Sequence, residues 1–312
     1  MQVPEIFIPT GTWNVHMGIS GEQVLEADRK AEEAGVDGLF SGDHVTFYGA
    51  GNDGLINLTA VAAVTQRVKL MTSVYLLALR HPTPVAMQCA MLDQLSLGRL
   101  ILGVGIGGED ANEWWACGVD PRTRARRTDE SLAIMRSLWT QEETTFEGKY
   151  YTLDKVRMYP KPFREEGVAV HIGGRSDAAL ERTARFGDAW ISIWVSARRM
   201  KEARERIDEL AAKHGRDPAK IGMGLQIWHA VDDDREQAKA RLARRMEGFY
   251  KIPFDRFERY SPSGRPEDIA EFLGPYLEAG VSQLNLLSVQ SSPDETVQAG
   301  LAVKEAIAKM VG

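Results

Sequence analysis

An aspartate–histidine pair, Asp43-His44, follows the short apolar run Gly38–Ser41. Histidine titrates near neutrality and therefore suits proton transfer, and a carboxylate can accept a hydrogen bond from the ring or ribityl group of a cofactor. The same two side chains also suit a simple hydrogen-bonded pair at the end of a strand. The residues by themselves leave both interpretations open.

A glycine-rich stretch, Gly173-Gly174-Arg175-Ser176, lies between a strand-like run and a helix-like run. Small residues at such a junction let backbone N–H groups and the helix dipole approach a phosphate, and an arginine adds a charge-assisted contact. A tight turn with Ser176 as the helix cap explains the same residues equally well. The glycines of residues 103–108 lack the spacing and the acidic residue of a dinucleotide fingerprint, which disfavours a Rossmann fold.

Two carboxylates, Glu109 and Glu113, lie one helical turn apart after the run Leu100–Val104. Either could face a site, but isolated carboxylates at this spacing are typical of a solvated helix face, which is the interpretation that we favour from the residues alone. Four aromatic residues could line an apolar pocket, although such spacing is more often core packing: Trp114, Trp115, Phe249 and Tyr250.

Metal and nucleophile motifs are absent from the sequence. It has no His-Glu-x-x-His, no Cys/His cluster, no Gly-x-Ser-x-Gly and no P-loop, so no metal site is expected. Its two cysteines, Cys89 and Cys117, are expected to be packing residues.

Composition excludes other classes of protein. The net charge of -6 is spread without basic blocks, so no nucleic-acid surface is expected. No run reaches the roughly 18 to 20 apolar residues that a membrane helix needs, and the first residues do not resemble a leader, so we expect a cytoplasmic protein with no membrane contact.

The elements that must position these residues alternate between short apolar runs and longer helical stretches, an order that predicts a parallel sheet. Glycines at likely helix ends separate the units: Gly35, Gly98, Gly187, Gly215 and Gly280. The strand candidates are Ile6–Pro9, Gly38–Ser41, Val68–Thr72, Leu100–Val104, Val168–Ile172, Ala189–Ile193, Met223–Ile227 and Gln283–Leu287.

Eight such units in 312 residues predict a single (β/α)8 TIM-barrel domain over residues 1–312. Insertions are expected after strands 4 and 7, near residues 142–166 and 247–265, and long insertions are often lids or binding loops. Because barrel enzymes place their sites at the carboxyl ends of the strands, the chemically suited residues above are expected on one face.

Seven landmarks in register on this pattern resemble the luciferase-like monooxygenase superfamily, and within it the F420-dependent oxidoreductases. They are Ser41–His44, Leu70–Val74, Leu95–Gly105, Phe146–Tyr151, His171–Gly174, Gly187–Trp190 and Glu278–Val281. The resemblance implies a flavin-type ring across the barrel mouth and a hydride transfer to or from a small organic substrate.

The resemblance also implies roles for particular residues. A bulge with a cis peptide at Ser73-Val74 would support the back of the ring, the turn Gly173–Ser176 would hold the cofactor phosphate, and Asp43 would bond the ring or its tail. The run Gly108–Glu113 is similar to the deazaflavin branch. In that branch His44 and Glu109 would act on the substrate proton while C5 of coenzyme F420 exchanges hydride, and Asn112 would contact the cofactor.

Where sugar-phosphate dehydrogenases of this branch carry a tryptophan shortly after the histidine, this chain reads Val45-Thr46-Phe47-Tyr48. The difference disfavours a sugar phosphate, and the aromatic insertions favour a larger, less polar substrate. The family habit implies a homodimer.

Three alternatives remain on the same barrel. One is an FMN-dependent two-component monooxygenase, which would need a separate reductase as partner. Another is a non-catalytic flavin-binding barrel, and a third is a sugar-phosphate isomerase, which only the glycine turn favours.

Overall fold

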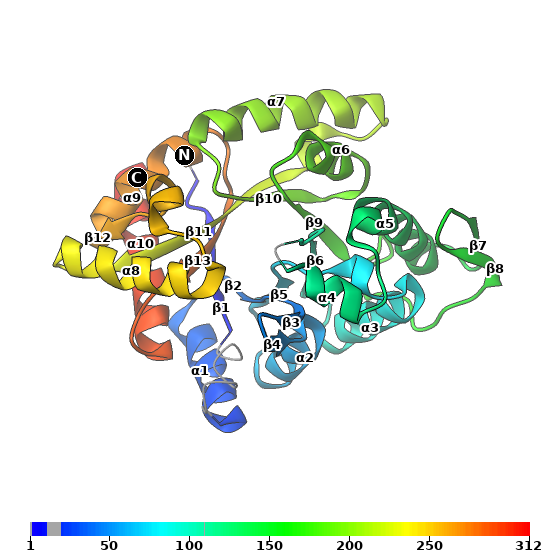
Figure 1. The fold of residues 1–312 in the computed structure, drawn as a ribbon, viewed down its shortest axis with the longest axis horizontal. Helices are drawn as coiled ribbons and strands as arrows, with labels where there is room; N and C mark the ends of the chain where they lie inside the picture. The colour runs from blue at the N-terminus through cyan, green and yellow to red at the C-terminus, as the bar shows by residue number, and fades with distance from the viewer. Residues whose placement is uncertain (1, 11–19, 109) are drawn as a thin grey trace.

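A closed barrel of eight parallel strands is the framework of residues 2–10, 20–108 and 110–312, which the computed structural model describes (Figure 1). Its last pairing, between β10 and β11, closes the circle, so the predicted TIM barrel is confirmed. In spatial order the strands are β1 (Glu5–Pro9), β2 (Gly38–Ser41), β5 (Lys69–Thr72), β6 (Leu100–Val104), β9 (Ala169–Gly173), β10 (Ala189–Ile193), β11 (Gly222–Val231) and β13 (Gln283–Ser288).

Helices surround the barrel and cover its outer face (Figure 1). Strands such as β2 and β6 are buried along their whole length because helices cover one face and the barrel interior the other, which explains their continuous apolar character. The helices are α1 (Gly21–Ala34), α2 (Gly54–Val64), α3 (Pro82–Leu95), α4 (Ala111–Ala116), α5 (Arg124–Thr140), α6 (Asp177–Phe186), α7 (Ala197–Lys213), α8 (Arg235–Tyr250), α9 (Pro266–Glu278) and α10 (Pro293–Val311).

The predicted glycine stops are found where helices end, with one difference. Four of the five glycines have positive φ, as at Gly35, where φ is +95°. Gly187 also caps its helix, but its φ is -84°. A Cβ at Gly187 would lie 3.0 Å from Ile172 Cγ1, so close packing rather than a left-handed turn explains this glycine.

The first predicted insertion forms the hairpin of β7 (Thr144–Glu147) and β8 (Thr152–Val156). It lies at the far edge of the molecule beyond α5 (Figure 1). Buried Glu130 of α5 accepts the backbone N–H groups of Lys149 and Tyr150 at 3.0 and 2.9 Å, which ties the hairpin to that helix. Its place is therefore peripheral, unlike that of a lid.

The second predicted insertion follows α8 and lies at the mouth of the barrel. Two short turns, Phe254–Arg256 and Glu258–Tyr260, lead to strand β12 (Ser263–Gly264), which extends the sheet beside the end of β11. Phe257 packs on Trp194 and Tyr250 with ring centroids 4.8 and 5.3 Å apart.

A further hairpin, absent from the predicted elements, follows β2. It consists of β3 (His44–Phe47) and β4 (Ala50–Asn52) and lies over the carboxyl ends of the neighbouring strands. Because β3 begins at His44, this hairpin sets the direction of the histidine side chain.

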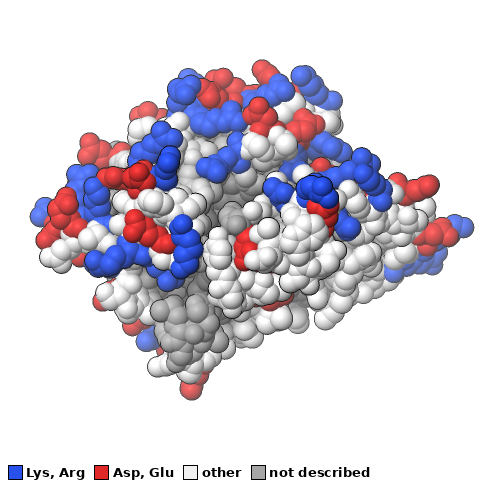
Figure 2. Space-filling view, in the orientation of Figure 1, with Lys and Arg blue, Asp and Glu red and all other residues white. Residues whose placement is uncertain are grey.

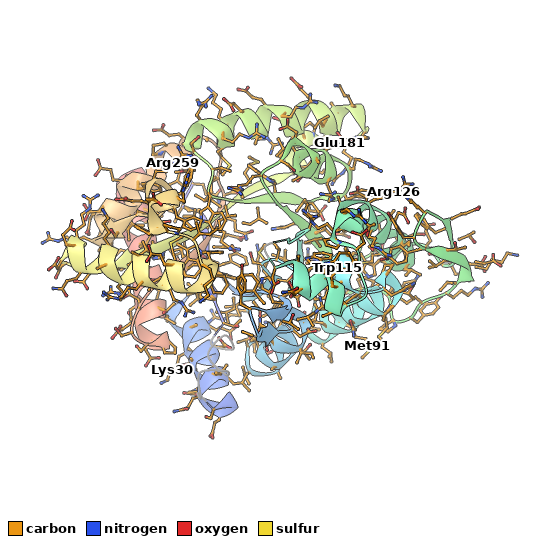
Figure 3. All side chains as sticks on the ribbon, viewed as in Figure 1. Lys30, Met91, Trp115, Arg126, Glu181 and Arg259 are labelled. Atoms are coloured by element: carbon orange, nitrogen blue, oxygen red, sulfur yellow. The ribbon has the colours of Figure 1, made fainter. Side chains whose placement is uncertain are left out.

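The barrel interior contains an apolar cluster of Phe7, Phe40, Met71, Ile101 and Ile191. Outward-facing aromatics also occur: Trp115 on α4 projects from the surface (Figure 3) and is 57% exposed.

Among the helices of the described ranges, none combines the length and the apolar character that crossing a membrane requires.

Candidate active site

The carboxyl ends of the strands surround a cavity of about 250 Å³ that contains most of the predicted site residues. Figure 2 shows the molecule hollowed between α8 and α4, with Lys and Arg side chains along the upper rim. Ser176 lines a cavity that adjoins it, Asn112 lines neither of the two, and Glu109 lies outside the described residues. The predicted residues that line the first cavity are Asp43, His44, Ser73, Val74, Gly173, Gly174 and Arg175.

His44 is paired with a buried carboxylate. Its Nδ1 lies 3.1 Å from Oε2 and 3.3 Å from Oε1 of Glu113, and its ring stacks on Phe47 with centroids 4.3 Å apart. When Nδ1–H donates to the carboxylate, Nε2 carries the lone pair. The arrangement suits proton transfer at Nε2, with Glu113 holding the ring in place.

Glu113 corrects an expectation, because its side chain is buried rather than solvated. Its Oε1 also accepts the backbone N–H of Val45 at 2.6 Å. Burial by itself would raise the pKa of Glu113, but the hydrogen bond and charge of His44, together with backbone N–H groups, hold that pKa below its ordinary value. The carboxylate is therefore ionised beside the histidine.

A sequence signal for Glu113 was present in Asp110, a residue type that starts helices. Asp110 caps α4 by accepting the N–H of Asn112 at 2.9 Å, and its other oxygen accepts the N–H of Tyr48 at 3.2 Å. The cap thus fixes the first turn of α4 against the hairpin, which points Glu113 towards His44.

Asp43 is buried and bonded on both carboxylate oxygens. Arg80 donates to Oδ2 at 2.7 Å and to Oδ1 at 2.8 Å, and the N–H groups of Leu76 and Gly54 donate at 3.0 and 3.3 Å. Burial raises the pKa of Asp43, while the charge and hydrogen bonds of Arg80 oppose that rise. Asp43 therefore ties the end of β2 to the segment after β5, and its contact with a cofactor stays a prediction.

The Ser73-Val74 peptide is cis, as predicted. Ser73 Oγ donates to Gln226 Oε1 at 2.6 Å and accepts from Asn285 Nδ2 at 3.0 Å, so the segment that follows β5 is joined to β11 and β13 across the barrel.

Val74 projects between two glycines at the mouth. A Cβ at Gly105 would lie 2.3 Å from Val74 Cγ2, and one at Gly173 would lie 2.9 Å from Val74 Cγ1. Both positions therefore need glycine, and the valine methyl groups form an apolar floor on which a flat ring can rest.

The glycine turn after β9 opens into the adjoining cavity, of about 590 Å³. Gly174 has φ +127°, and Ser176 caps α6 by accepting the N–H of Ala179 at 3.3 Å. Arg175 lies over the ring of Trp194 at 5.4 Å. The helix cap formed by Ser176 does not exclude an anion site. The first N–H groups of α6 and the Arg175 side chain face the same cavity, which an anionic group can enter.

Trp194 lines both cavities in an uncommon backbone conformation, with φ +54°. Bulky residues seldom adopt this left-handed region, and such positions cluster at functional sites.

Aromatic rings from β11 and α8 form another wall of the cavity. Trp228 Nε1 donates to the Tyr250 hydroxyl at 3.0 Å, and Phe249 lies 5.2 Å from Phe47 between ring centroids. Both Phe249 and Tyr250 line the cavity, whereas Trp114 is buried in the core. The interpretation that aromatic residues line a pocket therefore holds for Phe249 and Tyr250.

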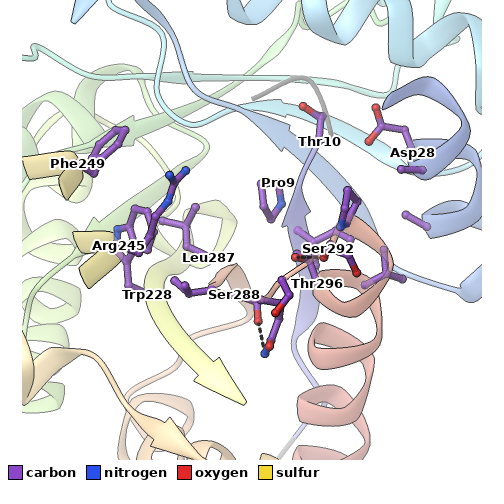
Figure 4. Close-up of a pocket in the computed structure, with 18 residues that line it drawn as sticks. Pro9, Thr10, Asp28, Trp228, Arg245, Phe249, Leu287, Ser288, Ser292 and Thr296 are labelled. Carbon is purple, nitrogen blue, oxygen red and sulfur yellow. Dashed lines mark hydrogen bonds between the residues drawn. The ribbon is translucent and has the colours of Figure 1, made fainter. Parts of the chain in front are cut away.

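A further cavity adjoins this wall between β1, β13 and the start of α10 (Figure 4). It shares Trp228, Phe249 and Leu287 with the site cavity, and Arg245 of α8 extends towards it. In the part of the chain that the structure describes, no three His, Cys, Asp or Glu side chains are grouped as metal ligands would be.

Comparison with known proteins shows that nearly the whole chain matches one protein family. The family model described as luciferase-like monooxygenase matches residues 5–304. An F420-dependent glucose-6-phosphate dehydrogenase of Kineococcus radiotolerans is 30% identical over 288 residues, which cover 82% of this chain and 83% of that protein.

Solved structures share the fold at lower identity. An F420-dependent secondary alcohol dehydrogenase in complex with an F420-acetone adduct has a TM-score of 0.83 at 22% identity, covering 98% of this chain and 99% of that one. Monooxygenase RslO1 from Streptomyces bottropensis has a TM-score of 0.82 at 21% identity, covering 99% and 100%.

Proposed function

We propose that this chain, which belongs to the luciferase-like monooxygenase family, is an F420-dependent oxidoreductase that transfers a hydride between deazaflavin C5 and a small organic substrate. The observation that carries the proposal is that two adjoining cavities connect the His44–Glu113 pair and the Val74 floor to the glycine turn. One end suits proton transfer, the middle suits a flat ring, and the other end suits an anionic tail.

The residues present fit this cofactor. Val74 and the Gly105–Gly173 pair leave a flat apolar floor, and Arg175 with the amino end of α6 matches a phosphate. When bound, a deazaflavin supplies hydride transfer at C5 and, because it lacks N5, forms no useful oxygen adduct. Asp43 would bond the ring or the tail of the cofactor while it holds the segment after β5. Asn112, which is exposed on α4 and lines neither cavity, would contact the cofactor from that helix.

In the oxidative direction, His44 Nε2 takes the hydroxyl proton of the substrate as its carbon loses hydride. The ionised Glu113 stabilises the charged imidazole and keeps Nε2 directed at the cavity. Glu109 is proposed as the second proton-transfer group. In the reductive direction, the same histidine returns the proton to the substrate oxygen.

Titration of the purified protein with F420 and with FMN tests the cofactor. Micromolar binding of F420 is expected. Micromolar binding of FMN with F420 ignored would contradict the proposal and favour the two-component monooxygenase with its separate reductase.

The proposal also covers the domain organisation, the cellular location and the oligomeric state. Residues 1–312 would act as one domain in a cytoplasmic homodimer. Light scattering of the purified chain measures the oligomeric state, and a monomer at micromolar concentration would contradict the dimer.

A further inference from the structure

A cavity of about 190 Å³ beside His44 is not needed by the cofactor path described above. It lies between the β3–β4 hairpin and the end of α8, and it shares His44, Phe47 and Phe249 with the site cavity. Two cations, Arg245 and Lys251, are among its lining residues, and Arg245 also lines the cavity beside β1 and α10. The cavity therefore joins the proton-transfer group to positive charge across aromatic rings.

Arg245 is available to a ligand. Within the described ranges it has no ion pair and no side-chain hydrogen bond, whereas Arg241, one turn earlier on α8, binds Asp232 at 3.0 Å. Lys251 Nζ donates to the carbonyl of Gly248 at 2.6 Å, which keeps its charge near the same rim. No Asp or Glu is among the described residues that line this cavity, so an anion would meet no like charge there.

The walls between the two ends favour an apolar body over a polyol. Phe47, Tyr48 and Phe249 present ring surface, and the Asn52 amide is already bonded to Ser41 and Gly42. A sugar would leave its hydroxyl groups without partners against these rings, which is costly, whereas an aromatic or aliphatic body would gain from burial.

Building on the proposed function, we propose that the substrate is an apolar, ring-sized alcohol or ketone that carries a carboxylate, and that Arg245 determines this specificity. The carboxylate pairs with Arg245 while the carbinol carbon lies at His44. On oxidation the C–H electron pair leaves as hydride to the cofactor, the O–H proton passes to His44 Nε2, and a C=O bond forms.

The test compares probes that differ only in the carboxylate. Binding of 4-acetylbenzoate and of acetophenone is measured by calorimetry for the unmodified protein, Arg245→Met and the control Arg244→Met. Arg244 is the neighbouring exposed arginine of α8 and lines none of the cavities described above.

The unmodified protein is expected to bind 4-acetylbenzoate about tenfold more tightly than acetophenone, as a charge-assisted pair provides. Arg245→Met should reduce this preference to about twofold or less, and Arg244→Met should leave it intact. A preference that survives in Arg245→Met, no preference in the unmodified protein, or no binding of either probe would overturn the inference.

Turnover separates this inference from the cofactor proposal. With F420, kcat/KM for 4-(1-hydroxyethyl)benzoate should exceed that for 1-phenylethanol and for glucose 6-phosphate. Higher kcat/KM for glucose 6-phosphate would overturn the substrate class alone. Failure to bind F420, with the Arg245-dependent binding preference intact, would overturn the cofactor and leave the carboxylate site standing.

Discussion

The two sides of the barrel mouth differ in residue type: one has paired charged residues and the other has aromatic rings. On the side of β2, β5 and β6, buried carboxylates are hydrogen-bonded to basic partners, as in Asp43–Arg80 at 2.7 Å and Glu113–His44 at 3.1 Å. On the side of β10, β11 and α8, the wall consists of rings such as Trp228 and Phe249.

The difference predicts two kinds of response to substitution. Removing one partner of a buried charged pair leaves an uncompensated charge, which is costly to the fold. Removing a ring from a wall costs contact area with a ligand and leaves no charge behind. Variants on the first side should therefore affect stability and kcat, and variants on the second side should affect KM.

The largest effect is expected for Arg80→Ala, which leaves buried Asp43 without its cation. The free energy of unfolding should fall by about 3 kcal/mol, measured by chemical denaturation. The double variant with Asp43→Asn should recover part of this loss. A loss below about 0.5 kcal/mol would place this pair with exposed salt bridges and weaken the contrast between the sides.

His44→Ala should lower kcat by about 100-fold because the general acid–base group is removed. The Kd for F420 should stay within about twofold, since the ring rests on Val74 and the tail on the glycine turn. Steady-state kinetics and a cofactor titration measure the two quantities. Unchanged turnover would favour the non-catalytic flavin-binding barrel.

Glu113→Gln should lower kcat by about tenfold, because a neutral amide neither stabilises the imidazolium nor fixes its orientation as the carboxylate does. His44 remains present, so the effect should be smaller than that of His44→Ala. An equal loss from both variants would show that the pair acts as one unit.

The same variant should change the pH dependence of stability. The pKa of Glu113 in the folded chain lies below its ordinary value of 4.5, so its stabilising contribution is present above that value and is lost as pH falls through the folded-state pKa. The difference in unfolding free energy between the unmodified protein and Glu113→Gln should therefore shrink on acidification. Denaturation at a series of pH values measures it, and a constant difference would contradict the assignment.

The smallest effect is expected on the aromatic side. Phe249→Ala should raise KM by about fivefold, while kcat changes about twofold or less, because the ring supplies contact area rather than charge. Tyr159→Ala, which removes a ring that is 66% exposed and lies away from the mouth, is the matched control. A kcat loss for Phe249→Ala comparable to that of Glu113→Gln would remove the distinction between the sides.

The barrel could be predicted because eight apolar runs and their glycine stops are local signals. The partners of the site residues could not. Glu113 was expected in solvent because its burial depends on the β3–β4 hairpin, whose polar and glycine residues give little strand signal. His44 could be identified from the sequence as a candidate, but the direction of its ring could not be predicted.

The two insertions show the same limit. Both could be identified as long connections, and length alone suggested that each is a lid or a binding loop. One is bound to the side of α5 by Glu130, and the other lies beside Trp194 at the mouth. Their places depend on contacts between distant segments, which no local pattern in the chain specifies.

The bridge from Ser73 to Gln226 and Asn285 restricts how this barrel can be recombined with its relatives. Ser73 comes from the first half of the chain, and both of its partners come from the second half. A chimera that exchanges one half-barrel would separate a buried hydroxyl from the amides that complete its hydrogen bonds. A recombined enzyme must therefore inherit all three residues together, so the half-barrels are not independent modules.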